Sequence, residues 1–230
     1  MKKKCIIVQT FIFIIVFILG SCKKNSEEVC FKKDTTTIDE SSCSFLNEET
    51  LMQYTNSEFA YRFLMAAKVS RILCQGEGRY DISLLFGTRY EVSIDDYKRT
   101  MIITSNENNH QVFFHEDCIV VRDLRSNRSS VHSIVEGIGN ELDPVIIVAV
   151  AAKVYHQEVG SIPYHINHEE LLFQTESYLC MHPRKSWCNK ERMEKKLEEY
   201  CGGAPAFVGG TDCGCIWGDF FCICITEFEC

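Results

Sequence analysis

Four cysteines near the carboxyl end of the chain stand at mirror positions around a Gly-Asp pair, and their spacing could serve cross-linking or metal binding. They are Cys213, Cys215, Cys222 and Cys224. A two-residue turn that begins with Gly218 favours a type II′ hairpin, so we predict a hairpin over residues 211–226. That register places the cysteines in facing, hydrogen-bonded pairs, with all four sulfurs on one face of the hairpin.

Three arrangements of these sulfurs are open. They can bridge across the hairpin, or bridge to the remaining cysteines of the same region, which are Cys180, Cys188, Cys201 and Cys230. Four thiolates on one face can also bind zinc, although zinc knuckles use Cys-x-x-Cys spacing and this stretch has Cys-x-Cys. An oxidising location, argued below, favours disulfides.

A second group of residues with metal-binding chemistry lies at 164–170. His165 and His168 would share a face if this stretch were helical, and Glu169 could complete a metal site for an exported hydrolase. The stretch lacks the His-Glu-x-x-His spacing of zinc proteases, and the alternative is a set of polar surface residues at the end of a strand.

Motifs for nucleophilic catalysis and phosphate binding are missing from the sequence. It has no Gly-x-Ser-x-Gly elbow and no Gly-x-x-x-x-Gly-Lys-Ser/Thr loop. Cys74 or Cys118 could act as a nucleophile, but thiols in an oxidising compartment usually pair, and we expect a Cys74–Cys118 bridge. We predict no catalytic residue and no cofactor.

The number of cysteines is the unusual feature of the composition. The chain has 230 residues with 14 cysteines, while its 46% apolar and 24% charged residues are ordinary for a globular protein. Twelve cysteines are expected to form structural disulfides: Cys30, Cys43, Cys74, Cys118, Cys180, Cys188, Cys201, Cys213, Cys215, Cys222, Cys224 and Cys230.

Residues 1–21 have the order of a signal peptide. Three lysines at 2–4 precede an almost unbroken apolar run from Ile6 to Leu19, and two small residues follow. The apolar run is shorter than the ~20 residues that span a membrane, although an uncleaved signal anchor is the alternative. We expect an extracytoplasmic protein, either secreted or held at the cell surface.

The end of this segment resembles the lipobox of bacterial lipoproteins. The residues that carry the resemblance are Leu19-Gly20-Ser21-Cys22, and the polar stretch 23–28 is similar to the tethers of Bacteroidota lipoproteins. The resemblance covers residues 1–28 and implies that Cys22 is lipidated and anchors the chain to a membrane surface. In a eukaryotic host the sequon Asn127-Arg128-Ser129 would instead mark Asn127 for glycosylation. Both origins are open.

Charge argues against nucleic acid as a partner. The net charge is −8, and removal of the signal peptide takes away three lysines and makes the chain more acidic. Binding to phosphate backbones needs clustered Lys and Arg, which the sequence lacks.

Apolar periodicity predicts the elements of the mature chain after a polar tether at 22–45. A helix is expected from Ser57 to Cys74, where apolar residues recur every three or four positions. Short strands with short connections should then form an antiparallel meander, at 82–86, 90–94, 101–103, 112–114 and 118–121. Two further helices are predicted at 130–141 and 144–157, the second starting at Pro144 and apolar all round.

The predicted fold class is therefore α+β, an antiparallel β-meander with packed helices over residues 46–178. A small disulfide-rich module would follow at 179–230, with a helix at 187–201 and the hairpin at 211–226, because the last 51 residues hold eight cysteines.

Function is predicted only by class. An exported, disulfide-stabilised binding module for an unknown protein or glycan ligand fits best, since no catalytic motif is present. The alternatives are an exported hydrolase or metal-dependent enzyme that uses His165, His168 and Glu169, and a secreted toxin or effector.

Overall fold

The computed structural model describes the body of the chain, residues 58–85, 87–139, 141–160, 163–172, 176–183, 187–203 and 205–230. The predicted signal peptide at 1–21 and tether at 22–45, with Cys22, Cys30 and Cys43, lie outside these residues. The fold is α+β and mostly antiparallel sheet, in agreement with the predicted class.

A large sheet of eight antiparallel strands forms one side of the molecule. Its order is β7-β6-β5-β4-β3-β2-β1-β9, so the first seven strands are a meander in which each strand pairs with its neighbour in sequence. The strands are β1 (Val69–Gly76), β2 (Arg79–Leu84), β3 (Arg89–Asp95), β4 (Thr100–Thr104), β5 (Asn109–Phe114), β6 (Ile119–Asp123), β7 (Ser129–His132) and β9 (Tyr164–His165).

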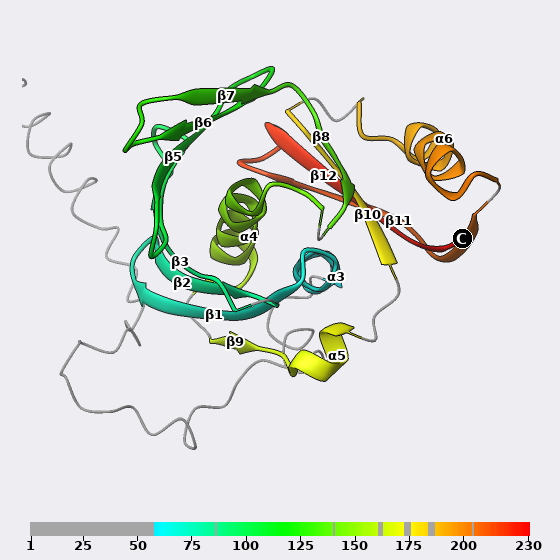
Figure 1. The fold of residues 1–230 in the computed structure, drawn as a ribbon, viewed down its shortest axis with the longest axis horizontal. Helices are drawn as coiled ribbons and strands as arrows, with labels where there is room; N and C mark the ends of the chain where they lie inside the picture. Colours follow the sequence, from blue (N-terminus) through cyan, green and yellow to red (C-terminus); the bar gives the residue numbers. More distant parts are fainter. Residues whose placement is uncertain are drawn as a thin grey trace, which may run out of the picture.

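Helix α4 (Pro144–Glu158) lies inside the curve of this sheet (Figure 1). It starts as predicted, with Pro144 in the first turn and the Asp143 side chain accepting a hydrogen bond from the Val145 amide at 2.9 Å. Every residue from Val145 to Tyr155 is buried, because strands of both sheets and helix α3 (Glu58–Ala66) contact it. The apolar periphery of α4 is therefore covered on all sides.

A second sheet of four antiparallel strands closes the opposite side of α4. Its order is β11-β12-β10-β8, and its strands are β8 (Val135–Ile138), β10 (Glu176–His182), β11 (Ala206–Ile216) and β12 (Phe221–Glu229). Strand β10 spans the predicted boundary between residues 178 and 179, and it pairs with β8 on one side and β12 on the other. Both parts of the chain thus contribute strands to this sheet.

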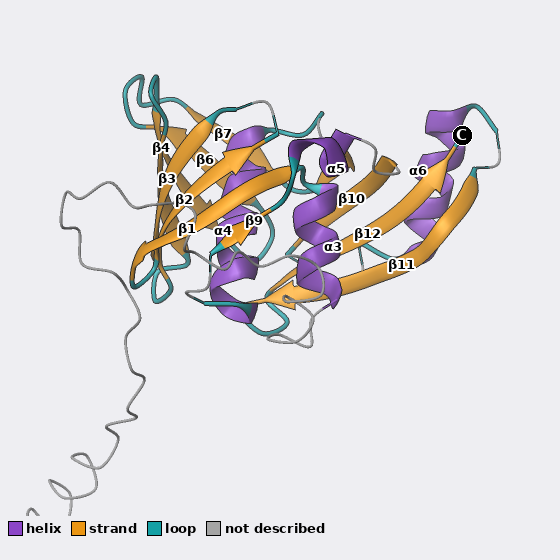
Figure 2. Ribbon diagram, turned by 90° about the horizontal axis from the view of Figure 1, so that it is seen from below, coloured by secondary structure: helices purple, strands orange, loops and turns teal. Residues whose placement is uncertain are grey.

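Each face of the second sheet packs against a different helix (Figure 2). Ile216, Phe221, Ile223 and Ile225 join the core around α4. The opposite face carries α6 (Lys190–Cys201), whose Met193 and Leu197 are buried in a smaller cluster. This helix begins at the Asn189 N-cap and ends at Gly202, which has a left-handed conformation.

The predicted helix at 57–74 is wrong beyond its first half. Helix α3 ends at Ala66, Lys68 adopts a positive φ of 54°, and β1 begins at Val69. The register of β1 shifts between Val69 and Arg71, and both Val69 and Ile72 point into the core. A β-bulge therefore gives this strand the three-residue apolar spacing that is typical of a helix.

The predicted helix at 130–141 is also wrong, because β7 and β8 occupy this region. In β8 the buried residues are Val135 and Ile138, again three apart, and Gly137 has a φ of 152°. Val135 belongs to the core around α4, whereas Ile138 belongs to the smaller cluster around α6, and the pairing with β10 shows no register shift. The strand therefore alternates regularly, and burial of both its faces produces the misleading spacing.

Four disulfides lie in the C-terminal region: Cys180–Cys188, Cys201–Cys230, Cys213–Cys224 and Cys215–Cys222. The hairpin pairs Cys213 with Cys224 and Cys215 with Cys222, with Cα separations of 4.2 and 4.0 Å. These separations fit non-hydrogen-bonded pairs, not the hydrogen-bonded pairs that we predicted. The turn has four residues, 217–220, and not two. The hydrogen-bonded and non-hydrogen-bonded positions of the hairpin are therefore exchanged, and both cysteine pairs fall at non-hydrogen-bonded positions.

A bridge between Cys74 and Cys118 is ruled out by the sheet order. Cys74 lies on β1 and Cys118 directly precedes β6, so four strands separate them. At about 4.8 Å per strand, the path across the sheet between them is more than ~20 Å long, whereas the Cα atoms of a disulfide lie within ~7 Å of each other. Both residues carry thiols in this structure.

No helix in the described part of the chain has both the length and the apolar composition needed to cross a membrane.

Close contact between α3 and the end of β8 gives a test of this packing. A Cβ atom added at Gly139 would overlap the carbonyl oxygen of Ala66, which ends α3. We expect Gly139→Ala to lower the free energy of unfolding by at least ~1–3 kcal/mol, the usual cost of overpacking. Urea denaturation would measure it. Gly203→Ala is the matched control, since no atom lies within 4 Å of its added Cβ and its φ is not positive, and an equal loss there would contradict the packing.

Candidate functional site

A cluster of ionisable side chains gathers at the carboxyl end of α4. Lys153 Nζ donates to Asp96 Oδ1 at 2.6 Å, and His156 Nε2 lies 3.2 Å from Asp96 Oδ2. The hydroxyl of Tyr80 lies 2.6 Å from His156 Nδ1 and donates to the Gly160 carbonyl at 3.1 Å. This cluster could not be predicted from the sequence, because its members are far apart in the chain and match no motif.

Three elements position the cluster. Lys153 and His156 are three residues apart and so share a face of α4, while Tyr80 comes from β2 and Asp96 from the turn after β3. The hairpin turn joins them, since Trp217 Nε1 donates to Asp96 Oδ1 at 3.0 Å. The cluster therefore fastens the helix to both sheets.

Lys153 and Asp96 are buried to different extents, and this difference affects the pKa of Asp96. The Lys153 side chain is 7% exposed and that of Asp96 is 47% exposed. Partial burial alone would raise the pKa of Asp96, but the hydrogen bonds from Lys153 and Trp217 and the positive charge of Lys153 outweigh it, so the pKa lies below its usual range. Asp96 is thus held as the counter-ion of a buried ammonium group.

The geometry of this cluster suits anchoring better than catalysis. Both ring nitrogens of His156 already face an oxygen atom, Oη of Tyr80 and Oδ2 of Asp96. A general base needs a nitrogen within reach of the substrate proton, and here a structural contact would first have to break.

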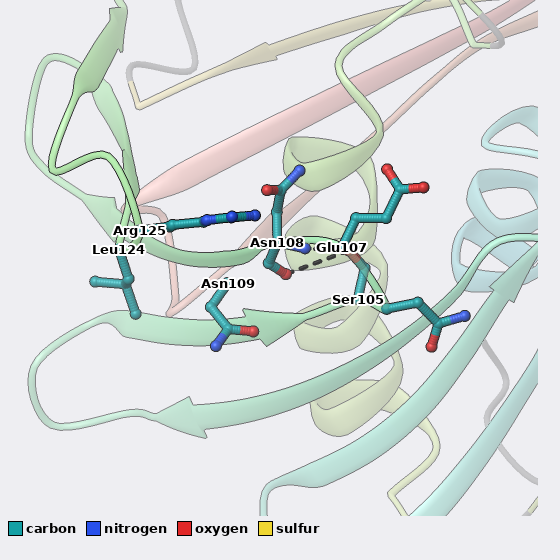
Figure 3. Close-up of a pocket in the computed structure, with 7 residues that line it drawn as sticks. Ser105, Glu107, Asn108, Asn109, Leu124 and Arg125 are labelled. Carbon is teal, nitrogen blue, oxygen red and sulfur yellow. Dashed lines mark hydrogen bonds between the residues drawn. The ribbon is translucent and has the colours of Figure 1, made fainter.

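A polar pocket of about 300 Å³ lies between two loops at the edge of the large sheet (Figure 3). The loops follow β4 and β6, and the lining residues are Ser105, Asn106, Glu107, Asn108, Asn109, Leu124 and Arg125. Neither the pocket nor its residues could be predicted from the sequence, because polar loop residues carry no periodic signal.

Hydrogen bonds fix the shape of both loops. The Ser105 amide donates to the Asn108 carbonyl at 2.9 Å, and the Leu124 amide donates to the Asn109 carbonyl at 2.8 Å, which ties one loop to the other. Asp123 closes the second loop by accepting from the Arg125 amide at 2.8 Å. The pocket is therefore preorganised by its own backbone.

The predicted glycosylation residue, Asn127, lies in one of the two loops that form the pocket. Asn127 is exposed, has a φ of 57° and accepts a hydrogen bond from Arg122 Nε at 2.9 Å through its side-chain oxygen. It belongs to the loop that supplies Leu124 and Arg125. Glycosylation of Asn127 stays a prediction.

The histidine site predicted at 165–169 is only partly described. His165 lies exposed on β9, and Glu169 lies exposed in the short helix α5 (His168–Leu172). The side chain of His168 lies outside the described part of the chain. Among the residues that are described, no three His, Cys, Asp or Glu side chains are placed to hold a metal ion.

Comparisons with known proteins give no family for the chain. No family model matches, and neither the curated proteins nor the solved structures contain a match.

The uneven burial of the Asp96–Lys153 pair predicts that its two partners respond differently to substitution. Asp96→Asn leaves a buried ammonium without its counter-ion, and we expect it to cost about 1–3 kcal/mol, reduced from the usual cost of breaking a buried pair because Asp96 is half-exposed. Lys153→Met leaves a carboxylate that water can reach, and should change stability by less than about 1 kcal/mol. Chemical denaturation at neutral pH measures both, and equal losses would contradict this account.

The pH dependence of the same pair follows from the lowered pKa of Asp96. A carboxyl group with a lower pKa in the folded state stabilises the fold above its unfolded pKa, about 4, and loses this effect as the pH falls toward the folded pKa. The difference in stability between the wild type and Asp96→Asn should therefore shrink below about pH 4.

Proposed function

We propose that the chain is an exported, disulfide-stabilised binding module that recognises a polar ligand through the pocket between the β4–β5 and β6–β7 loops. The pocket is the observation that carries this proposal. It is lined by three asparagines, a serine, a glutamate, an arginine and Leu124, which is 43% exposed.

A glycan is the ligand whose chemistry fits these groups best. Side-chain amides offer both donors and acceptors, and the arginine adds further donors, which matches the mixed character of sugar hydroxyls. The exposed leucine provides a small apolar surface for a sugar face. Because the backbone already holds both loops, little conformational entropy would be lost on binding.

Export is supported by the disulfides. Four bridges within residues 180–230 are typical of proteins that mature in oxidising compartments. Cleavage before Cys22, lipidation of that residue and attachment to a membrane surface are part of this proposal and come from the sequence of residues 1–28.

A glycan-array experiment tests the binding site. The full mature protein should bind at least one class of printed glycan, and the double variant Asn108→Ala/Arg125→Ala should weaken that binding by about tenfold or more, since two hydrogen-bonding groups to a polar ligand are lost. Glu198→Ala, an exposed residue of α6 on the other sheet, is the control and should bind like the wild type. Absence of any glycan signal, or equal binding by the double variant, would overturn the proposal.

Intact-mass measurement tests export and processing. Protein recovered from the surface or the medium of expressing cells should lack residues 1–21 and carry the mass of a lipid group on Cys22. Alkylation with and without reduction should show eight cysteines of residues 180–230 in four bridges. A cytosolic product that retains Met1 would contradict export.

A further inference from the structure

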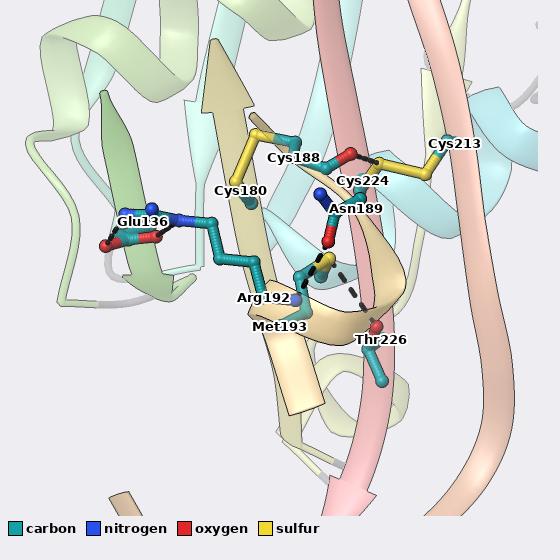
Figure 4. The surroundings of a disulfide bond; sticks show 9 residues. All are labelled: Glu136, Cys180, Cys188, Asn189, Arg192, Met193, Cys213, Cys224 and Thr226. Carbon is teal, nitrogen blue, oxygen red and sulfur yellow. Dashed lines mark hydrogen bonds and ion pairs between the residues drawn. A yellow bond between two sulfur atoms is a disulfide. The ribbon is translucent and has the colours of Figure 1, made fainter. Parts of the chain in front are cut away.

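Two of the disulfides lie side by side on one face of the second sheet. Strand β12 pairs Cys224 with Cys180 on β10 and with Cys213 on β11, so the three cysteines form a row across adjacent strands. Residues directly opposite each other point to the same face, with Cβ atoms about 4.5–5.5 Å apart. The Cys180–Cys188 and Cys213–Cys224 bridges are therefore neighbours (Figure 4).

A contact outside the strands joins the two bridges more closely. Cys224 Sγ lies 3.1 Å from the carbonyl oxygen of Cys188, the residue to which Cys180 is bonded. The sulfur of Cys224 thus lies against the backbone of Cys188, and Cys180 faces Cys224 from the adjacent strand.

Exposure differs sharply among these four cysteines. Cys180, Cys188 and Cys224 are 0%, 2% and 0% exposed, whereas Cys213 is exposed. A thiol arriving from solvent can therefore reach this pair of bridges through Cys213.

We propose that the Cys213–Cys224 bridge is the entry point of a two-step thiol–disulfide exchange that ends at Cys188. In the first step an external thiolate attacks Cys213 Sγ, forms a mixed disulfide with it, and displaces Cys224 as a thiolate. In the second step Cys224 attacks Cys180 Sγ, forms a Cys180–Cys224 bridge across adjacent strands, and displaces Cys188 as a thiolate that takes up a proton. Each step breaks one S–S bond and forms one, so no oxidant is required.

The exchange would loosen helix α6. Cys188 directly precedes the Asn189 N-cap, and its bridge to Cys180 ties the start of the helix to β10. After the exchange, the start of α6 would depend on side-chain contacts, which include the paired hydrogen bonds from Arg192 to Glu136 at 2.9 Å. The arrangement makes the position of α6 sensitive to thiols outside the cell.

Brief treatment of the full mature protein with glutathione, followed by acid quenching, alkylation and peptide mapping, tests the proposal. The expected products are glutathione on Cys213, a Cys180–Cys224 bridge and an alkylated Cys188. Alkylation of Cys224 in place of Cys188, or no adduct on Cys213, would overturn the proposal.

Two variants keep the result interpretable. Cys201→Ser/Cys230→Ser removes the Cys201–Cys230 bridge, in which Cys230 is also exposed. This variant should leave the exchange unchanged. Cys180→Ser/Cys188→Ser removes the acceptor bridge, so glutathione should still add to Cys213 while the thiol stays on Cys224. Circular dichroism would verify that both variants are folded, and failure of Cys213 to react in the first variant would also contradict the proposal.

Discussion

Burial of a helix that is apolar on every side is the constraint on which this structure depends. A helix with one apolar stripe can lie on a sheet and face water, but α4 is buried continuously from Val145 to Tyr155. The curved meander covers one side of it, the four-stranded sheet the other, and α3 fills the gap between them. The two sheets and α3 together supply the apolar surfaces that exclude water from this helix.

The polar cluster at the end of α4 follows from the same constraint. Lys153 is a charged residue within the buried run, and its ammonium group reaches the edge of the core where Asp96 meets water. Asp96, which accepts from this ammonium group, comes from a turn of the large sheet, and Trp217 of the hairpin in the small sheet donates to the same carboxylate. Correct pairing of these groups fixes how the two sheets sit around the helix.

Much of the fold could be predicted from the sequence wherever apolar spacing was regular. The alternation at Tyr90, Val92 and Ile94 correctly indicated β3, and Asp143-Pro144 correctly marked the start of α4. The failures occurred where buried residues of a strand lie three positions apart. A bulge causes this spacing in β1, and burial of both faces causes it in β8, where Val135 and Ile138 belong to different clusters. In the sequence, such spacing cannot be distinguished from that of a helix. The candidate pocket and the Asp96 cluster could not be predicted, because each depends on side chains brought together only by strand order.

The position of α4 within the chain also dictates the order in which the molecule can be completed. The meander precedes the helix, but β11 begins at Ala206, long after α4 ends at Glu158. While the chain is synthesised from its amino end, one side of α4 stays uncovered until β11 and β12 have been made. Such a surface favours aggregation, so folding before the carboxyl end is available would be hazardous. Stable burial of α4 is therefore possible only after the last residues of the chain have been synthesised.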